Sequence, residues 1–327
     1  MTLSDELTDW LLATDPALRW QVQRDLLGAD DSVWQATRAL VATEGYGARL
    51  LALQDPDGQW AGGAYFPVAG HPTGWVEGQQ GQPYTATTWS LWQLREWGLD
   101  ASALAGTAEK LAANSRWEYD DLPYWNGEVD VCINSFTLSA GTWLGADVAA
   151  LAAWFGEHQL ADGGWNCEWE NGATVSSFHS TLNAVKGLRY REAHGGADEQ
   201  LAAIRGRGEE YLLQRHLLNR LSSGEPVAAW ATQFGYPFRW KYNVLSALDH
   251  FREASANDGN APDPRLADAV AIVRSKRQSD GRWLSDVRLP GQVWFDVDAA
   301  PGEPSPWLTL YGLRVLNWWD HSEGAVA

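Results

Sequence analysis

The stretch QDPDGQW at residues 54–60 recurs as QLADGGW at residues 159–165 and, one residue shorter, as QSDGRW at residues 278–283. Each copy follows one helical pattern of apolar residues and precedes another. The Asp-Gly pair favours a tight turn because glycine adopts positive φ without strain. A turn that recurs in the same helical context is typical of a repeat architecture. The sequence therefore predicts a repeat protein in which each Trp fills a junction between neighbouring repeats.

Helical periodicity dominates the rest of the chain, and the alternation typical of strands is nearly absent. Six segments are predicted to be helices rich in apolar and aromatic residues: 16–27, 84–97, 132–144, 178–190, 240–252 and 305–319. Between them lie six amphipathic helical patterns: 3–12, 32–53, 101–113, 147–159, 197–218 and 264–277. Charges on one face of a helix indicate an outer layer. This alternation predicts an all-α fold, an α6/α6 toroid whose inner helices surround a central cavity.

Tryptophan is the compositional outlier, with 21 residues in a chain of 327. So many indole rings require a large, partly apolar interior or a wide lumen to line. This length suggests two domains as a prior, but a closed repeat array can form one, and we expect a single domain over residues 1–327. The loops 60–83 and 283–304 are long and rich in Gly, Pro and Trp, which is typical of functional rims or lids.

The net charge of −18, with no basic run, argues against binding to nucleic acid or to anionic membrane surfaces. No stretch approaches the roughly 18 continuous apolar residues of a membrane span. The first residues, MTLSDE, lack the pattern of a signal peptide, so we expect a cytoplasmic protein. The chain has two cysteines, Cys132 and Cys167, and a reducing compartment favours free thiols or metal ligands over a disulfide.

The spacing of the apolar helices gives positional information. Two of these helices end at Gly98 and Gly145, which are 47 residues apart. The same interval connects Thr85, Cys132 and His179, at the N-terminal ends of three consecutive apolar helices. We therefore expect Cys132 and His179 to be neighbours at one rim of the cavity.

Together these features resemble the terpenoid cyclase and protein prenyltransferase superfamily of α-toroids. The three Trp motifs resemble the QW repeats of that superfamily, and the resemblance covers essentially the whole chain. The chain as a whole is most similar to single-domain bacterial proteins described as squalene-cyclase-like or prenyltransferase-like. This resemblance implies the toroid fold but no particular reaction.

Two segments resemble the zinc site of the protein farnesyltransferase β subunit. That family carries Asp-x-Cys at the start of one inner helix and Tyr-His-Thr at the start of the next. Here DVC at 130–132 and FHST at 178–181 match these elements. The resemblance implies that Asp130, Cys132 and His179 are zinc ligands, and carboxylate, thiolate and imidazole are the ligands that zinc prefers.

The loop before the second of these helices adds two candidates. Cys167 is a candidate fourth zinc ligand, and the adjacent Glu168 is a candidate general base beside the metal or the substrate. The structural alternative is that Cys132 is a small buried residue, His179 a capped histidine of the lumen and Glu168 a solvated carboxylate.

The chain departs from both branches of the superfamily at the start of the apolar helix 132–144. Basic residues before the cysteine hold the prenyl diphosphate in the prenyltransferases, whereas residues 122–128 here read LPYWNGE, so the use of a diphosphate is left open. The class II cyclases protonate an alkene with the middle Asp of Asp-x-Asp-Asp. The stretch EVDV at 128–131 preserves only that residue, Asp130, which would be a weaker acid without neighbouring carboxyls.

Aromatic residues at or near the predicted inner-helix starts would line the cavity. They are Tyr84, Trp89, Trp125, Trp143, Trp240 and Trp307. Ring faces stabilise positive charge, so an aromatic lumen suits an apolar or cationic guest. The alternative role for these residues is packing.

The leading hypothesis is a zinc-dependent enzyme that acts on a small, largely apolar molecule in the toroid cavity, either isoprenoid-like or thiol-containing. One alternative is an acid catalyst of the class II cyclase type that uses Asp130. Another is a non-catalytic toroid that binds a small molecule or a protein. The sequence leaves open the substrate, the reaction and any partner subunit.

Overall fold

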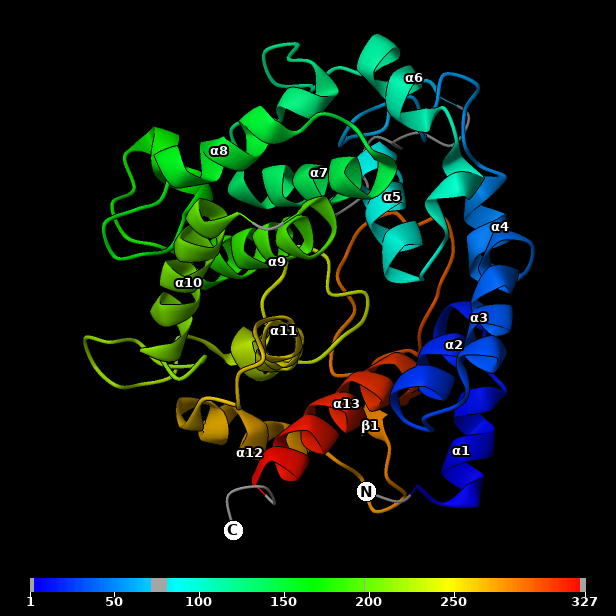
Figure 1. Ribbon diagram of the computed structural model, residues 1–327, viewed down its shortest axis with the longest axis vertical. Helices are drawn as coiled ribbons and strands as arrows, with labels where there is room; N and C mark the ends of the chain where they lie inside the picture. The colour runs from blue at the N-terminus through cyan, green and yellow to red at the C-terminus, as the bar shows by residue number, and fades with distance from the viewer. Residues whose placement is uncertain (1–2, 72–80, 197, 324–327) are drawn as a thin grey trace. The chain divides into compact units, whose positions relative to one another are not determined.

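The computed structural model describes residues 3–71, 81–196 and 198–323, and these residues are mainly helical (Figure 1). The helices are α1 (Asp5–Leu12), α2 (Pro16–Asp25), α3 (Asp31–Ala39), α4 (Gly45–Leu51), α5 (Thr87–Glu96), α6 (Thr107–Asn114), α7 (Val131–Leu144), α8 (Ala149–Glu157), α9 (Phe178–Gly195), α10 (Glu199–Leu213), α11 (Val244–Asp258), α12 (Ala267–Ser275) and α13 (Pro306–Glu323). A short antiparallel pair joins β1 (Trp283–Leu284) to β2 (Pro304–Ser305). The predicted all-α class is confirmed. Among the described helices, none has the length and apolar character that a bilayer crossing requires.

The chain divides into two compact units, each built from segments that are distant in sequence. Unit 1 contains Met1–Arg38, Tyr211–Arg288 and Val297–Ala327. Unit 2 contains Ala39–Glu210 and the short segment Leu289–Asp296. Part of the loop predicted to be a rim or lid, residues 72–80, lies outside the described residues.

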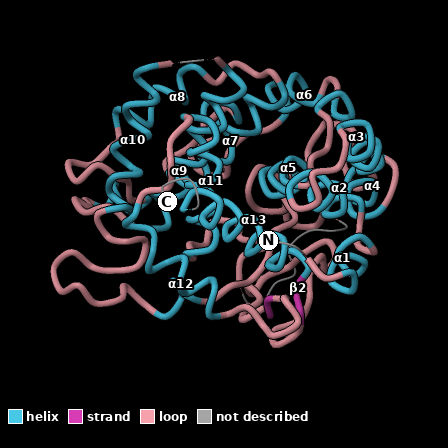
Figure 2. Tube along the Cα trace, turned by 60° about the horizontal axis from the view of Figure 1, so that its bottom comes forward, coloured by secondary structure: helices cyan, strands magenta, loops and turns pink. Residues whose placement is uncertain are grey.

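Buried and half-exposed helices alternate along unit 2. Helix α7 buries every residue from 131 to 141, whereas α8 buries only Leu151, Ala152 and Phe155. The next helix, α9, is again buried over most of its first eleven residues. Helices α7 and α9 lie side by side in Figures 1 and 2. The burial of individual residues in α7, α8 and α9 therefore follows the predicted alternation of apolar and amphipathic helices.

Two predicted helices are interrupted at glycines. The segment 32–53 forms α3, a 3-10 turn over 40–42 and then α4. The break falls where Gly45 has a φ of +62°. The segment 101–113 begins as a 3-10 turn, and α6 starts only after Gly106, whose φ is +81°. Positive φ cannot continue a right-handed helix, so each glycine stands at the break before the next helix begins.

The three Trp motifs make the same hydrogen bonds in each copy. Each Trp side chain is fully buried, and its indole N–H donates over 2.8–2.9 Å to a carbonyl ten residues earlier. Each Trp backbone N–H donates over 3.0–3.1 Å to a threonine hydroxyl on the following helix. The sets are Trp60 with Leu50 and Thr87, Trp165 with Phe155 and Thr181, and Trp283 with Val273 and Thr309. Each Trp thus links an amphipathic helix to the next buried helix.

The segment Leu289–Asp296, which we call the strap, packs on the rest of unit 2. The carbonyl of Gln292 accepts a hydrogen bond of 2.8 Å from the backbone N–H of Tyr84. The indole of Trp294 donates over 3.3 Å to the hydroxyl of Ser90 on α5. The guanidinium of Arg49 lies 3.8 Å from the centre of the Phe295 ring. The strap therefore fixes the chain that leads into α5.

Candidate functional site

The N-terminal ends of α7 and α9 bring two predicted site residues to matching positions. Cys132 and His179 are each the second residue of their helix, as the 47-residue register requires. The side-chain amide of Asn183 donates to the Cys132 Sγ over 3.4 Å and to the His179 carbonyl over 2.9 Å. Cys132 and the backbone of His179 are therefore neighbours. Thr85 differs, because it lies two residues before α5 begins.

Helix α7, which has no Trp motif before it, carries an asparagine at the register position of two threonines that bind Trp motifs. Thr87 and Thr181 bind a Trp backbone, and Asn134 lies 47 residues from each of them. Asn134 instead exchanges two hydrogen bonds of 2.7 Å with the backbone of Glu128. This exchange fixes the turn that carries Glu128 and Asp130 onto the start of α7.

The two cysteines form a close pair at this end of α7. Their sulfur atoms lie 3.5 Å apart, although Cys167 belongs to the 3-10 turn η4 (Cys167–Asn171), 35 residues further along the chain. Cys132 is 7% exposed and Cys167 is half-buried. The Ser180 hydroxyl donates to Cys167 Sγ over 3.3 Å. Hydrogen bonding between the thiols, followed by burial, raises the pKa of Cys132, and the same hydrogen bond lowers the pKa of Cys167. Of the two thiols, Cys167 therefore has the lower pKa.

Two carboxyl groups lie at the start of α7, and one of them, Asp130, is beside Cys167. Burial raises the pKa of Asp130, and a hydrogen bond with Cys167 opposes this shift. Burial, together with the charge of Asp130, raises the pKa of Glu128 to about 7. One Glu128 oxygen accepts a hydrogen bond of 2.8 Å from the Val129 N–H. The other, Oε1, is buried with no hydrogen-bond partner among the described residues.

Tyr65 belongs to this site, although the sequence did not single it out. Burial raises the pKa of its hydroxyl, and the nearby charges of Cys132 and Asp130 raise it further. Its backbone N–H donates over 3.0 Å to Glu118, which anchors this part of the loop. The only available signal was its position in loop 60–83, predicted to be a rim or lid.

An aromatic cluster, which we call the aromatic wall, extends from Tyr65. It consists of Tyr65, Tyr84, Trp89 and Phe136. The Trp89 ring centre lies 5.0 Å from those of Tyr65 and Tyr84 and 5.3 Å from that of Phe136. Tyr84 and Trp89 are thus two predicted cavity residues that the structure does bring together.

The other predicted aromatic residues lie elsewhere. Trp125 packs on Gly141 and donates to a backbone carbonyl over 2.9 Å, which is a packing role. The prediction that Trp143 lies near a helix start is wrong, because it falls at the far end of α7, roughly 17 Å from Cys132 by helical rise. Trp240 is half-buried in the loop before α11. Trp307 stacks on Tyr236 in unit 1, with ring centres 4.3 Å apart.

Glu168 follows Cys167 in the chain and acts on the site through its charge. Glu168 is exposed on η4, accepts a 2.7 Å hydrogen bond from Asn171, and adds to the raised pKa of Asp130 through its charge. Within the described ranges, no group of three or more His, Cys, Asp or Glu side chains is arranged to hold a metal ion. The arrangement is a thiol pair with a carboxyl beside it.

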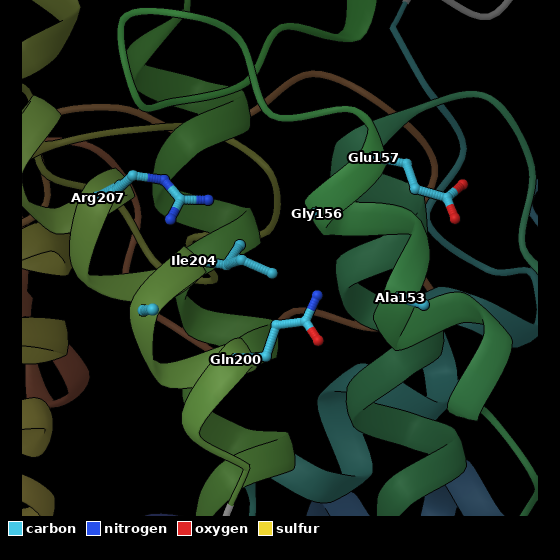
Figure 3. Close-up of a pocket in the computed structure, with 7 residues that line it drawn as sticks. Ala153, Gly156, Glu157, Gln200, Ile204 and Arg207 are labelled. Atoms are coloured by element: carbon cyan, nitrogen blue, oxygen red, sulfur yellow. The ribbon is translucent and has the colours of Figure 1, made fainter.

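A separate pocket of about 390 Å³ lies between α8 and α10, where Gln200 and Ile204 point toward α8 (Figure 3). It shares no residue with the thiol pair or the aromatic wall. Apolar, polar and charged residues line this pocket: Ala153, Gly156, Glu157, Gln200, Ala203, Ile204 and Arg207.

A scan of the chain against models of known protein families finds no match, and a search of curated protein sequences finds none either.

Proposed function

We propose that the start of α7 holds a zinc ion, and that the protein is a zinc-dependent enzyme acting on a small, largely apolar molecule. The observation that carries this proposal is the convergence of the chain's two thiols beside Asp130. Two thiolates on one tetrahedral zinc, each bonded at about 2.3 Å, lie roughly 3.7 Å apart. The 3.5 Å between the two sulfurs is close to that value, so the pair fits the ion.

Cys132 and Cys167 would hold the ion, and the side chains of Asp130 and His179 would have to move toward it to complete the set, because no third ligand is grouped with the two thiols among the described residues. Bound zinc would polarise a substrate oxygen or hold a substrate thiolate. Asn183 and Ser180 donate to the two sulfurs and would orient them, as outer hydrogen bonds commonly do for metal ligands.

The aromatic wall supports an apolar or cationic substrate. The four rings contact one another and reach the thiol pair through Tyr65, and ring faces attract positive charge. The absence of Lys and Arg from residues 122–128 argues against a diphosphate at this position.

We also propose the α6/α6 toroid with its central cavity as the architecture. The alternation of buried and half-exposed helices supports it, as does the Trp junction that recurs in both units. A crystal structure with the helices in an open array would contradict this arrangement.

The metal proposal is tested by elemental analysis of the purified protein after dialysis without chelator. About one zinc per chain is expected, with severe loss of zinc in Cys132→Ala and in His179→Ala. His194→Ala serves as the matched control, because it removes an exposed histidine at the other end of α9 and should leave the zinc content unchanged. Wild-type protein that binds no zinc at micromolar concentration would refute the proposal.

Cys167→Ala separates two versions of the site. Full loss of metal would indicate a closed site with four protein ligands. Retained metal would indicate a fourth position open to substrate, as in catalytic zinc sites.

The second candidate is acid catalysis by Asp130. It is favoured by the raised pKa of Asp130 and by Glu128, whose pKa of about 7 keeps a second carboxyl partly protonated at neutral pH. Metal-free protein that cyclises an isoprenoid, and loses this activity in Asp130→Asn, would support this candidate. Binding of an isoprenoid without turnover, in protein with or without zinc, would leave a non-catalytic binding role.

A further inference from the structure

Cys132 and Cys167 are the two cysteines of the chain, and their sulfurs lie 3.5 Å apart as free thiols. A disulfide has an S–S distance of about 2.05 Å, so the atoms must approach by roughly 1.5 Å. Cys132 is held in the first turn of a buried helix, whereas Cys167 opens the short turn η4 on a surface loop. This approach would require rotation of the Cys167 side chain and a small shift of η4.

We propose that Cys132 and Cys167 form a reversible disulfide in the presence of hydrogen peroxide, and that this disulfide and a bound metal are mutually exclusive states of one site. The second half of the proposal rests on the zinc site described above. The first half stands on the sulfur geometry alone.

The oxidation proceeds in two steps. Cys167, once it has lost its proton, attacks one oxygen of the peroxide; the O–O bond breaks, and Cys167 becomes a sulfenic acid while hydroxide leaves. The Cys132 sulfur then attacks the Cys167 sulfur; the S–O bond breaks, the S–S bond forms, and the Cys132 proton leaves with the hydroxyl as water. In sum, two thiols and one peroxide yield one disulfide and two waters.

Exposure assigns the two roles. Cys167 is half-buried at the surface and meets the oxidant first, whereas Cys132 is 7% exposed and lies behind it. The second thiol is already adjacent when the sulfenic acid forms. Disulfide closure therefore competes well with further oxidation of Cys167, and reduction by a dithiol restores both groups.

The test uses the full chain, reduced and then exposed to hydrogen peroxide, with free thiols alkylated under denaturing conditions. The expected result is an intact mass lower by two hydrogen atoms, no alkylated thiol, and one linked peptide pair containing both cysteines. Dithiothreitol should restore two alkylatable thiols. In Cys167→Ser and in Cys132→Ser the linked pair should be lost completely, while unchanged circular dichroism reports that each variant is folded.

Sulfinic or sulfonic acid at Cys167 without a linked pair, or disulfide-bonded dimers in place of the internal bond, would overturn the proposal. In zinc-loaded protein, release of one zinc for each disulfide formed is expected, and zinc retained by the oxidised chain would overturn the exclusivity. If the untreated protein holds no zinc, the proposed function fails, but the mass and peptide results still decide whether the disulfide forms.

Discussion

Ser180 and Asn183 lie about one turn apart on α9, and each donates to a different sulfur of the pair. Neither was singled out from the sequence, because a serine and an asparagine on a predicted buried helix carry no signal of what they contact. Their hydrogen bonds favour the negatively charged form of each sulfur, so both residues set the reactivity of the thiols without touching a substrate.

Ser180→Ala is expected to raise the pKa of Cys167, because the variant loses a hydroxyl that stabilises the thiolate. The rate of Cys167 alkylation by iodoacetamide, followed against pH, should shift to higher pH. Ser139→Ala is the matched control, since it removes a buried helical serine whose hydroxyl bonds only within α7. An unchanged profile in Ser180→Ala would show that the hydroxyl does not act on the sulfur.

Glu128 predicts a specific pH dependence of stability. Its pKa is about 7 in the folded protein and 4.5 in the unfolded chain, so the folded state retains a proton that the unfolded state has lost between these values. The free energy of unfolding therefore falls as pH rises through this window, by up to about 3 kcal/mol. In metal-free protein, Glu128→Gln should be more stable than the wild type at pH 8 and lose this advantage at pH 5.

Urea denaturation at the two pH values measures this difference. Glu109→Gln, on the exposed face of α6 and away from these carboxyls, is the control that should leave the pH profile unaltered. A Glu128→Gln advantage that is equal at both pH values would contradict the assignment.

At the scale of the elements, the Trp motif connects two helices through its hydrogen bonds. Thr181→Val keeps the side-chain volume but leaves the buried Trp165 N–H without its acceptor. We expect a loss of about 1–3 kcal/mol in the free energy of unfolding. Thr87→Val and Thr309→Val should show similar losses, because they occupy the same place in the other copies.

Thr142→Val is the matched control for this series. Its hydroxyl bonds only to a carbonyl of its own helix, Leu138, so a change within about 0.5 kcal/mol is expected. Equal losses in Thr142→Val and Thr181→Val would remove the case for a special junction.

Most helices could be predicted from apolar periodicity, because a helix buried on one face repeats its apolar residues with the helical turn. The breaks at Gly45 and Gly106 could not, since glycine in a helical pattern is tolerated at some positions and adopts positive φ at others. Within the candidate site, register placed Cys132 and His179 at matching positions. Tyr65 and the strap were missed because loops carry no periodicity that relates them to distant helices.

At the scale of the whole molecule, stability depends on contacts between segments far apart in sequence. Gly291 in the strap has a φ of +137°, and a Cβ there would lie 1.8 Å from the Gln82 carbonyl oxygen. Gly291→Ala should therefore displace the strap and destabilise the protein by about 2 kcal/mol or more in urea denaturation. Gly206→Ala, in open space on α10, should be neutral or stabilising by up to about 1 kcal/mol. Equal stability of the two variants would show that the strap is not held at Gly291.

The position of the strap in the sequence delays the completion of unit 2 during synthesis of the chain. The main part of unit 2 is complete at Glu210, but the strap that packs on it is synthesised about 80 residues later. At translation rates of roughly 5–20 residues per second, this gap lasts on the order of ten seconds. During that interval the Tyr84 backbone and the rings of Tyr46 and Trp97 lack their partners in the strap, so we expect chaperones to bind the nascent chain until residue 296 has left the ribosome.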